Sequence, residues 1–115
     1  MEYEHLFQKG QFGSLTLKNR IVMLPMGSVL CGVWGEVTRG LIDWYVRRAK
    51  GGAGLIIVEV CMAATAIDPI RLIPRILRAD DDCFISGLAC LADEVHESGA
   101  QIGIQLSPGG GAQAS

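Results

Sequence analysis

Three apolar segments of this chain each end in residues that could hold a flat, polar ligand. Pro25, Met26 and Gly27 follow the first segment, Val60 closes the second, and Gln105 lies near the end of the third. Proline has no backbone N–H, and glycine lets a main chain approach a planar ring closely. The Gln105 side chain carries both a carbonyl acceptor and an amide donor. This pair would suit a pyrimidine edge with alternating donors and acceptors, although spacing alone identifies no particular ligand.

The segments that precede these residues have the hydrophobic pattern of buried β-strands. Residues 21–24 form a continuous apolar run, and residues 55–60 form another that only Glu59 interrupts. Continuous runs are typical of parallel sheets, in which both faces of a strand are covered. The third segment carries an apolar side chain at every second position. We therefore predict three strands, at 21–24, 55–60 and 101–106.

Two amphipathic helices are predicted between the strands. The first begins after Thr38, a residue type that caps helices, and ends at Gly51. The second begins at the acidic stretch 80–82 and ends at Gly99. Its apolar residues recur at helical spacing, and they are Phe84, Leu88, Leu91, Ala92 and Val95. Residues 6–19 alternate around glycines and predict a hairpin-like lead-in before the first strand.

The order of the predicted elements is that of an α/β domain with a parallel sheet. Strands and helices alternate with short helix-to-strand connections, which favours right-handed crossovers. The doubly wound sheet and the (β/α)8 barrel both begin this way, and both bind ligands beyond the carboxyl ends of their strands. We therefore expect the ligand site just after Leu24, Val58 and Ile104. A chain of 115 residues can bury one core, so one domain or part of one is expected.

Composition and charge exclude several classes of partner. The formal charge is −2 and the basic residues are scattered, so there is no basic footprint for nucleic acid. No apolar run approaches the ~20 residues of a membrane span, and the polar, acidic first five residues do not resemble a signal peptide. We therefore expect a cytoplasmic protein that binds neither nucleic acid nor membranes. The four cysteines lack CxxC and zinc spacing, which predicts reduced, mostly buried thiols and no metal site.

Some polar and aromatic residues are interpreted as structural. Glu59 lies inside an apolar strand and is expected to be a buried carboxylate paired with a basic group, for example Arg20, because a buried charge needs a partner. Trp34, Trp44 and Tyr45 could form an aromatic box for a ligand. Packing in a loop and on a helix face is the favoured interpretation for these three.

Three sequence motifs resemble the Old Yellow Enzyme family of NADH:flavin oxidoreductases, in order and at the family's spacing. They are LTLKNRIVMLPMG (15–27), RAKGGAGLIIVE (48–59) and GAQIGIQLS (99–107). The resemblance extends over about residues 6–107, nearly the whole chain. The family fold is a (β/α)8 TIM barrel. The resemblance implies that residues 1–115 are the N-terminal portion of an FMN-binding β/α barrel, with three parallel strands, two helices and no second domain.

The resemblance also implies a cofactor and a reaction. Pro25, Met26 and Gly27 would lie along the isoalloxazine ring of FMN. Val60 would rest against the ring, and Gln105 would hydrogen-bond its pyrimidine portion. The family reaction passes a hydride from NADH or NADPH through the flavin to an activated alkene, here a small α,β-unsaturated carbonyl compound. Gly27 resembles the branch of enoate, dienoyl-CoA and bile-acid reductases, because another branch carries cysteine there.

The rest of the machinery is expected outside this chain. A complete barrel needs about 250 residues, so these 115 would supply only its first part. In the family, the catalytic residues and the FMN phosphate site come from later strands, so no catalytic residue is assigned here. The iron–sulfur cluster of dienoyl-CoA-type members would also have its ligands elsewhere. We expect an incomplete fragment that is inactive alone.

Two other functions stay open on the residues alone. A small doubly wound module could bind a phosphate ligand through Gly109, Gly110 and Gly111, which follow the third strand and could form an anion-binding nest. A truncated product without a ligand is the other. The leading interpretation is an FMN-dependent NAD(P)H oxidoreductase of the ene-reductase type.

Overall fold

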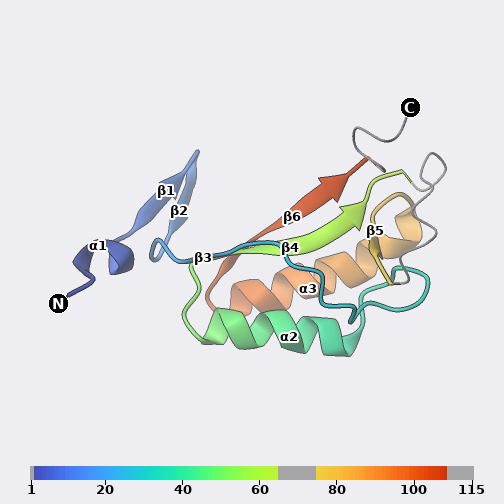
Figure 1. Ribbon diagram of the computed structural model, residues 1–115, viewed down its shortest axis with the longest axis horizontal. Helices are drawn as coiled ribbons and strands as arrows, with labels where there is room; N and C mark the ends of the chain where they lie inside the picture. Colours follow the sequence, from blue (N-terminus) through green and yellow to red (C-terminus); the bar gives the residue numbers. More distant parts are fainter. Residues whose placement is uncertain (1, 65–74, 109–115) are drawn as a thin grey trace.

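The computed structural model describes residues 2–64 and 75–108, which form a parallel sheet with two long helices on one face (Figure 1). The strands are β1 (Gly10–Phe12), β2 (Leu15–Leu17), β3 (Val22–Met23), β4 (Leu55–Met62), β5 (Leu77–Arg78) and β6 (Gln101–Ser107). The helices are α1 (Glu4–Phe7), α2 (Arg39–Lys50), α3 (Ile85–Glu97) and the 3₁₀ helix η3 (Asp82–Phe84). The predicted α/β fold class is confirmed, and the strands of the described residues do not close into a barrel. Gly109, Gly110 and Gly111 lie outside the described residues.

A hairpin precedes the main sheet, as the lead-in pattern predicts. β1 and β2 pair antiparallel, with Gly10 opposite Leu17. At the turn, Gly13 has φ +60°, a left-handed conformation that costs glycine little. Helix α1 was not predicted. It has four residues and none of them is buried, so it leaves no apolar periodicity in the sequence.

The three predicted parallel strands are confirmed in the main sheet. β4 lies between β3 and β6 and pairs in parallel with both. β3 is shorter than predicted, since only Val22 and Met23 pair with β4. β5 was not predicted, and it adds two residues beside the end of β4, with Cys61 opposite Leu77. A strand of two residues is too short to show alternation, which is why the sequence did not reveal it.

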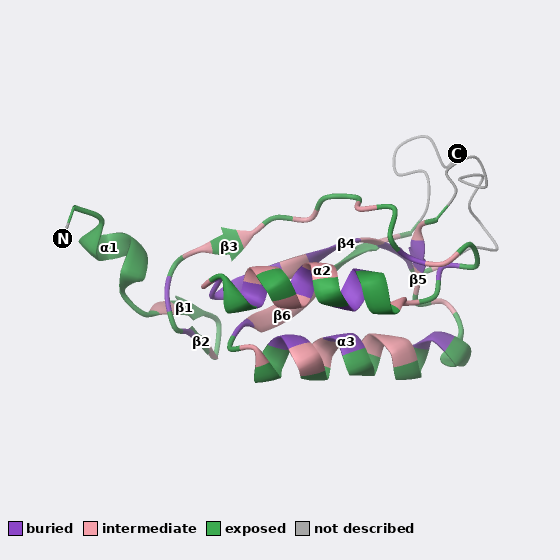
Figure 2. Cartoon of the chain, turned by 90° about the horizontal axis from the view of Figure 1, so that it is seen from below, coloured by how far each residue is buried: buried purple, intermediate pink, exposed green. Residues whose placement is uncertain are grey.

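Helix α2 begins and ends where its capping residues predict. The Thr38 hydroxyl accepts a hydrogen bond from the Leu41 N–H at 3.1 Å, as an N-cap should. After the last helical residue, Gly52 reverses the chain with φ +114°. The buried face packs on β4 and consists of Leu41, Ile42, Tyr45 and Ala49. Figure 2 shows this buried stripe and the exposed stripe on the other side of the helix.

Helix α3 covers the same face of the sheet beside α2. The Asp81 carboxylate accepts from the Cys83 N–H at 2.9 Å and begins η3, which leads into α3. Leu91 and Val95 are fully buried against the sheet. Gly99, with φ +93°, follows the helix end. The predicted acidic start and glycine end of this helix are confirmed.

All four cysteines are free thiols, as predicted, but Cys83 and Cys90 are exposed and not buried. Cys31 and Cys61 are buried, and burial raises the pKa of each to about 11. Both are therefore protonated at neutral pH. No group of His, Cys, Asp and Glu side chains that could hold a metal ion occurs within 2–64 and 75–108. No helix in this described part of the chain is long and apolar enough to cross a membrane.

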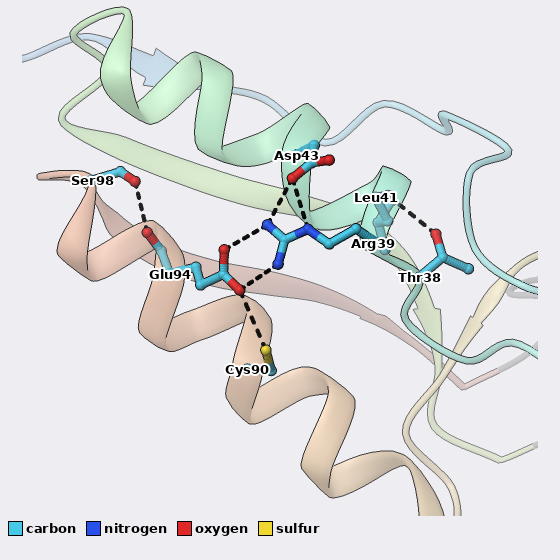
Figure 3. A network of polar contacts seen from close by, with 7 residues as sticks. All are labelled: Thr38, Arg39, Leu41, Asp43, Cys90, Glu94 and Ser98. Carbon is cyan, nitrogen blue, oxygen red and sulfur yellow. Dashed lines mark hydrogen bonds and ion pairs between the residues drawn. The ribbon is translucent and has the colours of Figure 1, made fainter.

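An ion-pair network joins α2 and α3 on their exposed side (Figure 3). The Arg39 guanidinium donates to both carboxylate oxygens of Glu94, each at 2.6 Å, and to Asp43 at 2.7 and 2.8 Å. The Cys90 thiol adds a longer contact to Glu94 at 3.6 Å. The Arg39 bonds hold the pKa of Glu94 below its usual range. Because the groups are exposed to solvent, the network should contribute little to stability.

Replacing Arg39→Gln should lower the thermal midpoint of unfolding slightly at neutral pH and not at all in acid. A carboxyl group with a depressed folded-state pKa contributes stability above its unfolded pKa and loses that contribution as the pH falls through the folded value. The difference between wild type and variant, followed by circular dichroism, should therefore shrink below about pH 4.5. It should also shrink in high salt. Arg47→Gln, on α2 outside the network, is the control, and an equal loss in both variants would contradict the prediction.

A candidate ligand-binding edge of the sheet

The strand register places Val60 and Gln105 side by side near the carboxyl ends of β4 and β6. The two residues are direct partners in the parallel pairing. Side chains at paired positions of neighbouring strands project from the same face of a sheet. Val60 is half-buried and Gln105 is exposed. Two of the five predicted site residues therefore share one face and one end of the sheet.

A β-bulge at Glu59 decides which face Val60 occupies. The pairing of β4 with β6 shifts register between Val58 and Val60, so Glu59 is an extra residue in β4. Val58 belongs to the core beneath the helices, and so does Cys61. Strict alternation from Val58 would turn Val60 toward the same core. The extra residue turns Val60 instead to the face that α2 and α3 leave uncovered.

Gln105 lies on this uncovered face as well. Its neighbours Ile104 and Leu106 line an open apolar groove together with α3 side chains that include Leu88 and Leu91. Because successive strand residues alternate between faces, Gln105 projects away from α3. By the same alternation, Gly103 lies on the face of Gln105. Neither α2 nor α3 covers the Gln105 side chain or the space above Gly103.

Glu59 ties the loop after β3 to this edge. Its carboxylate is 2% exposed and accepts hydrogen bonds from the Ser28 N–H at 2.8 Å, the Ser28 hydroxyl at 2.6 Å and the Tyr45 hydroxyl at 3.1 Å. The prediction that Arg20 is the basic partner of Glu59 is wrong. Arg20 precedes β3, at the other end of the sheet, and donates to the Lys9 carbonyl at 3.4 Å. Among the described residues, no ion pair includes Glu59.

The groups around Glu59 are held in their protonated forms. Burial, with a further contribution from the Glu59 carboxylate, raises the pKa of Tyr45 above its usual value. The phenol therefore stays a hydrogen-bond donor at neutral pH. The same carboxylate adds to the effect of burial on the pKa of Cys31, which rises to about 11. The groups seen to donate to Glu59 within 2–64 and 75–108 are uncharged hydroxyl and amide groups, which suits a carboxylate that only accepts hydrogen bonds.

The loop that carries Pro25, Met26 and Gly27 leads directly into Ser28. Met26 is 59% exposed, and Gly27 is exposed too. A Cβ atom built on Gly27 would meet no heavy atom within 4 Å, and the same holds for Gly103. Neither glycine has a left-handed φ. Backbone conformation and packing therefore give no reason for glycine at either position, and both leave open space of the kind that a flat ring needs.

The aromatic residues do not form a ligand box. Tyr45 is fully buried, and Trp44 is partly buried with the Arg48 guanidinium 3.3 Å from its ring centroid, so packing on the helix is confirmed for both. For Trp34 the packing prediction is wrong, because its side chain is 74% exposed. The backbone N–H of Trp34 donates to the Glu36 carboxylate at 3.0 Å. This bond fixes a tight turn and leaves the indole ring exposed to solvent.

The predicted site residues thus lie around one edge of the sheet, and their contact with a ligand stays a prediction. The sequence indicated that Glu59 is a buried carboxylate, but it did not reveal the partners Ser28 and Tyr45. These partners are 31 and 14 residues away from Glu59 in the chain, and no motif connects them to it. Gly103 was missed too, since a glycine within a strand gives no sign of what lies above it.

The comparisons with known proteins establish the family to which this chain belongs. Residues 5–115 match the model of the NADH:flavin oxidoreductase / NADH oxidase family, so the chain belongs to that family. It is 41% identical over 108 residues to the NADH oxidase of Thermoanaerobacter brockii, covering 94% of this chain and 16% of that protein. It is 36% identical over 115 residues to the cinnamate reductase of Clostridium sporogenes, covering 96% of this chain and 17% of that protein.

Solved structures agree with the sequence relatives. The crystal structure of Old Yellow Enzyme from a Pichia species superposes with a TM-score of 0.80 at 26% identity, over 89% of this chain and 26% of that one. The predicted resemblance to the Old Yellow Enzyme family is confirmed. The chain spans about a sixth of the length of the two relatives and about a quarter of the solved enzyme.

Gly27→Ala should leave the stability of the chain unchanged within about 0.5 kcal/mol, because the added methyl group meets open space. Gly54→Ala is the matched comparison. Its Cβ would lie 2.4 Å from the Asn19 side-chain oxygen and 2.8 Å from the Asn19 carbonyl oxygen, and overpacking of this kind costs about 1–3 kcal/mol. Urea unfolding of the two variants measures both effects. A large loss of stability in Gly27→Ala would show that the protein itself fills the space beside this loop.

Proposed function

We propose that this chain forms the first β/α units of an FMN-dependent oxidoreductase that reduces activated alkenes with NADH or NADPH. The family match supports a flavin enzyme that uses a nicotinamide reductant. The observation that carries the proposal for this chain is the pairing of Val60 with Gln105 on the sheet face opposite α2 and α3. When bound, FMN would supply the hydride chemistry, and these residues would hold and orient it.

In this proposal, five residues hold the flavin ring. The main chain of Pro25, Met26 and Gly27 lies along the ring, and Val60 packs against it. The exposed amide of Gln105 hydrogen-bonds the pyrimidine portion. The open space beside Gly27 supports the assignment, since the described chain itself leaves that position free.

The substrate class in the proposal is a small α,β-unsaturated carbonyl compound. One relative is a cinnamate reductase and another is an NADH:acrylate oxidoreductase, and both names denote α,β-unsaturated acids. Residues 1–115 would belong to a single barrel domain, with the catalytic residues and the phosphate site on later strands. A cytoplasmic location also belongs to the proposal, and the four free thiols support it.

Gln105→Leu in the full-length gene product should weaken FMN binding about tenfold, because one or two hydrogen bonds to the pyrimidine portion are lost. Its thermal stability without FMN should not change, since the side chain is exposed. Gln101→Leu is the matched control, because Gln101 lies in the same strand at its other end. Flavin fluorescence titration measures both affinities. Equal affinities for the two variants would contradict the role assigned to Gln105.

The isolated 115-residue chain should catalyse no NADH-dependent reduction of cinnamate, whereas the full-length gene product loaded with FMN should do so. The physical reason is that, in this proposal, the chain only helps to hold the flavin, and the catalytic residues lie on later strands. Anaerobic loss of NADH absorbance measures the reaction. Turnover by the isolated chain would refute the placement of the catalytic residues on later strands. A gene product that retains no flavin would refute the proposed function.

A further inference from the structure

A buried carboxylate lies at the base of the proposed flavin site, and its hydrogen-bond donors among the described residues are all uncharged. Glu59 is 2% exposed, and each of its three hydrogen-bond donors is an uncharged group from another segment. A buried carboxylate is costly unless its hydrogen bonds are made. The residue is buried, and its carboxylate already accepts these three hydrogen bonds. Its chemistry therefore points to holding structure in place.

The first feature that the contacts of Glu59 hold in place is the β-bulge in which this residue lies. The extra residue leaves the Glu59 N–H without a partner in β6. The Tyr45 hydroxyl accepts this N–H at 2.9 Å and donates its proton to the Glu59 carboxylate at 3.1 Å. Helix α2 thereby holds the bulge, and the bulge turns Val60 to the uncovered face.

The second group that Glu59 fixes is the loop after β3. One carboxylate oxygen accepts the Ser28 N–H and the other accepts the Ser28 hydroxyl. The next residue, Val29, has φ +62°, a left-handed conformation that is unfavourable for a β-branched side chain. Such a conformation persists only where surrounding contacts enforce it. The two bonds to Ser28 act directly beside this residue and directly after Gly27.

We propose that Glu59 is a positioning residue for the flavin site. Through its single buried carboxylate it fixes the position of the loop of Pro25, Met26 and Gly27 and the sheet face on which Val60 lies. This inference rests on the proposed function, because it names what holds that site in shape. Its consequence is specific. Loosening the carboxylate from Ser28 should disturb both how tightly the flavin is held and the surroundings of its ring, more than it disturbs the fold.

The test compares Ser28→Ala with Ser28→Thr and Ser98→Ala in the full-length gene product. Ser28→Ala removes one donor to Glu59 but leaves the backbone N–H and Tyr45 to satisfy the buried carboxylate, so the fold should persist. Ser28→Thr keeps the hydroxyl. Ser98→Ala removes a comparable bond, from the Ser98 hydroxyl to the Glu94 carbonyl at 2.8 Å, at the far end of α3. Measurements are the FMN dissociation constant, the absorbance spectrum of bound FMN and the thermal midpoint.

Ser28→Ala is expected to weaken FMN binding about tenfold and to shift the bound-flavin spectrum. Ser28→Thr should restore both within about threefold, and Ser98→Ala should match wild type in both. Wild-type affinity and spectrum in Ser28→Ala, whatever its thermal midpoint, would overturn the positioning role while leaving the flavin proposal intact. A wild-type protein that binds no FMN would instead overturn the proposed function, and the positioning role with it.

Discussion

The hydrogen bonds of the buried Glu59 carboxylate connect the three segments on which the candidate site depends. A carboxylate loses its hydration when it is buried, so donors must replace the lost water contacts. Here the donors come from the loop after β3 and from helix α2, through Ser28 and Tyr45. The loop, the helix and the strand therefore stabilise one another's positions through this one side chain. The position of the loop beside Val60 is therefore a property of the assembled layer and not of any one element.

The arrangement of layers explains why a ligand would approach from one side. Helices α2 and α3 bury one face of the sheet, and their side chains share one core with Ile56 and Val58. The opposite face carries Val60 and Gln105, and the amino-terminal hairpin lies near its other end. An apolar groove between α3 and β6 also stays open. These open surfaces accord with a chain that spans about a sixth of the length of its relatives.

Most of the fold could be read from the sequence because its main elements are long enough to have a period. Helix α3 shows regular apolar spacing, and Thr38 and Gly99 mark helix boundaries through capping geometry that depends on few neighbours. The parallel direction of β4 and β6 followed from the alternation of strands and helices. The elements that were missed, α1 and β5, are four and two residues long. Elements this short leave no periodic pattern in the sequence.

The sequence alone determined the family, the fold class and the residues at the strand ends, since motifs and periodicity are local properties of the chain. Tertiary structure decided the rest of the site. The bulge that turns Val60 depends on pairing with β6, and the neutral partners of Glu59 come from distant positions in the chain. The sequence suggested a charged partner because a buried charge needs compensation. Which groups provide it is set by which side chains the packed layers bring within hydrogen-bonding distance.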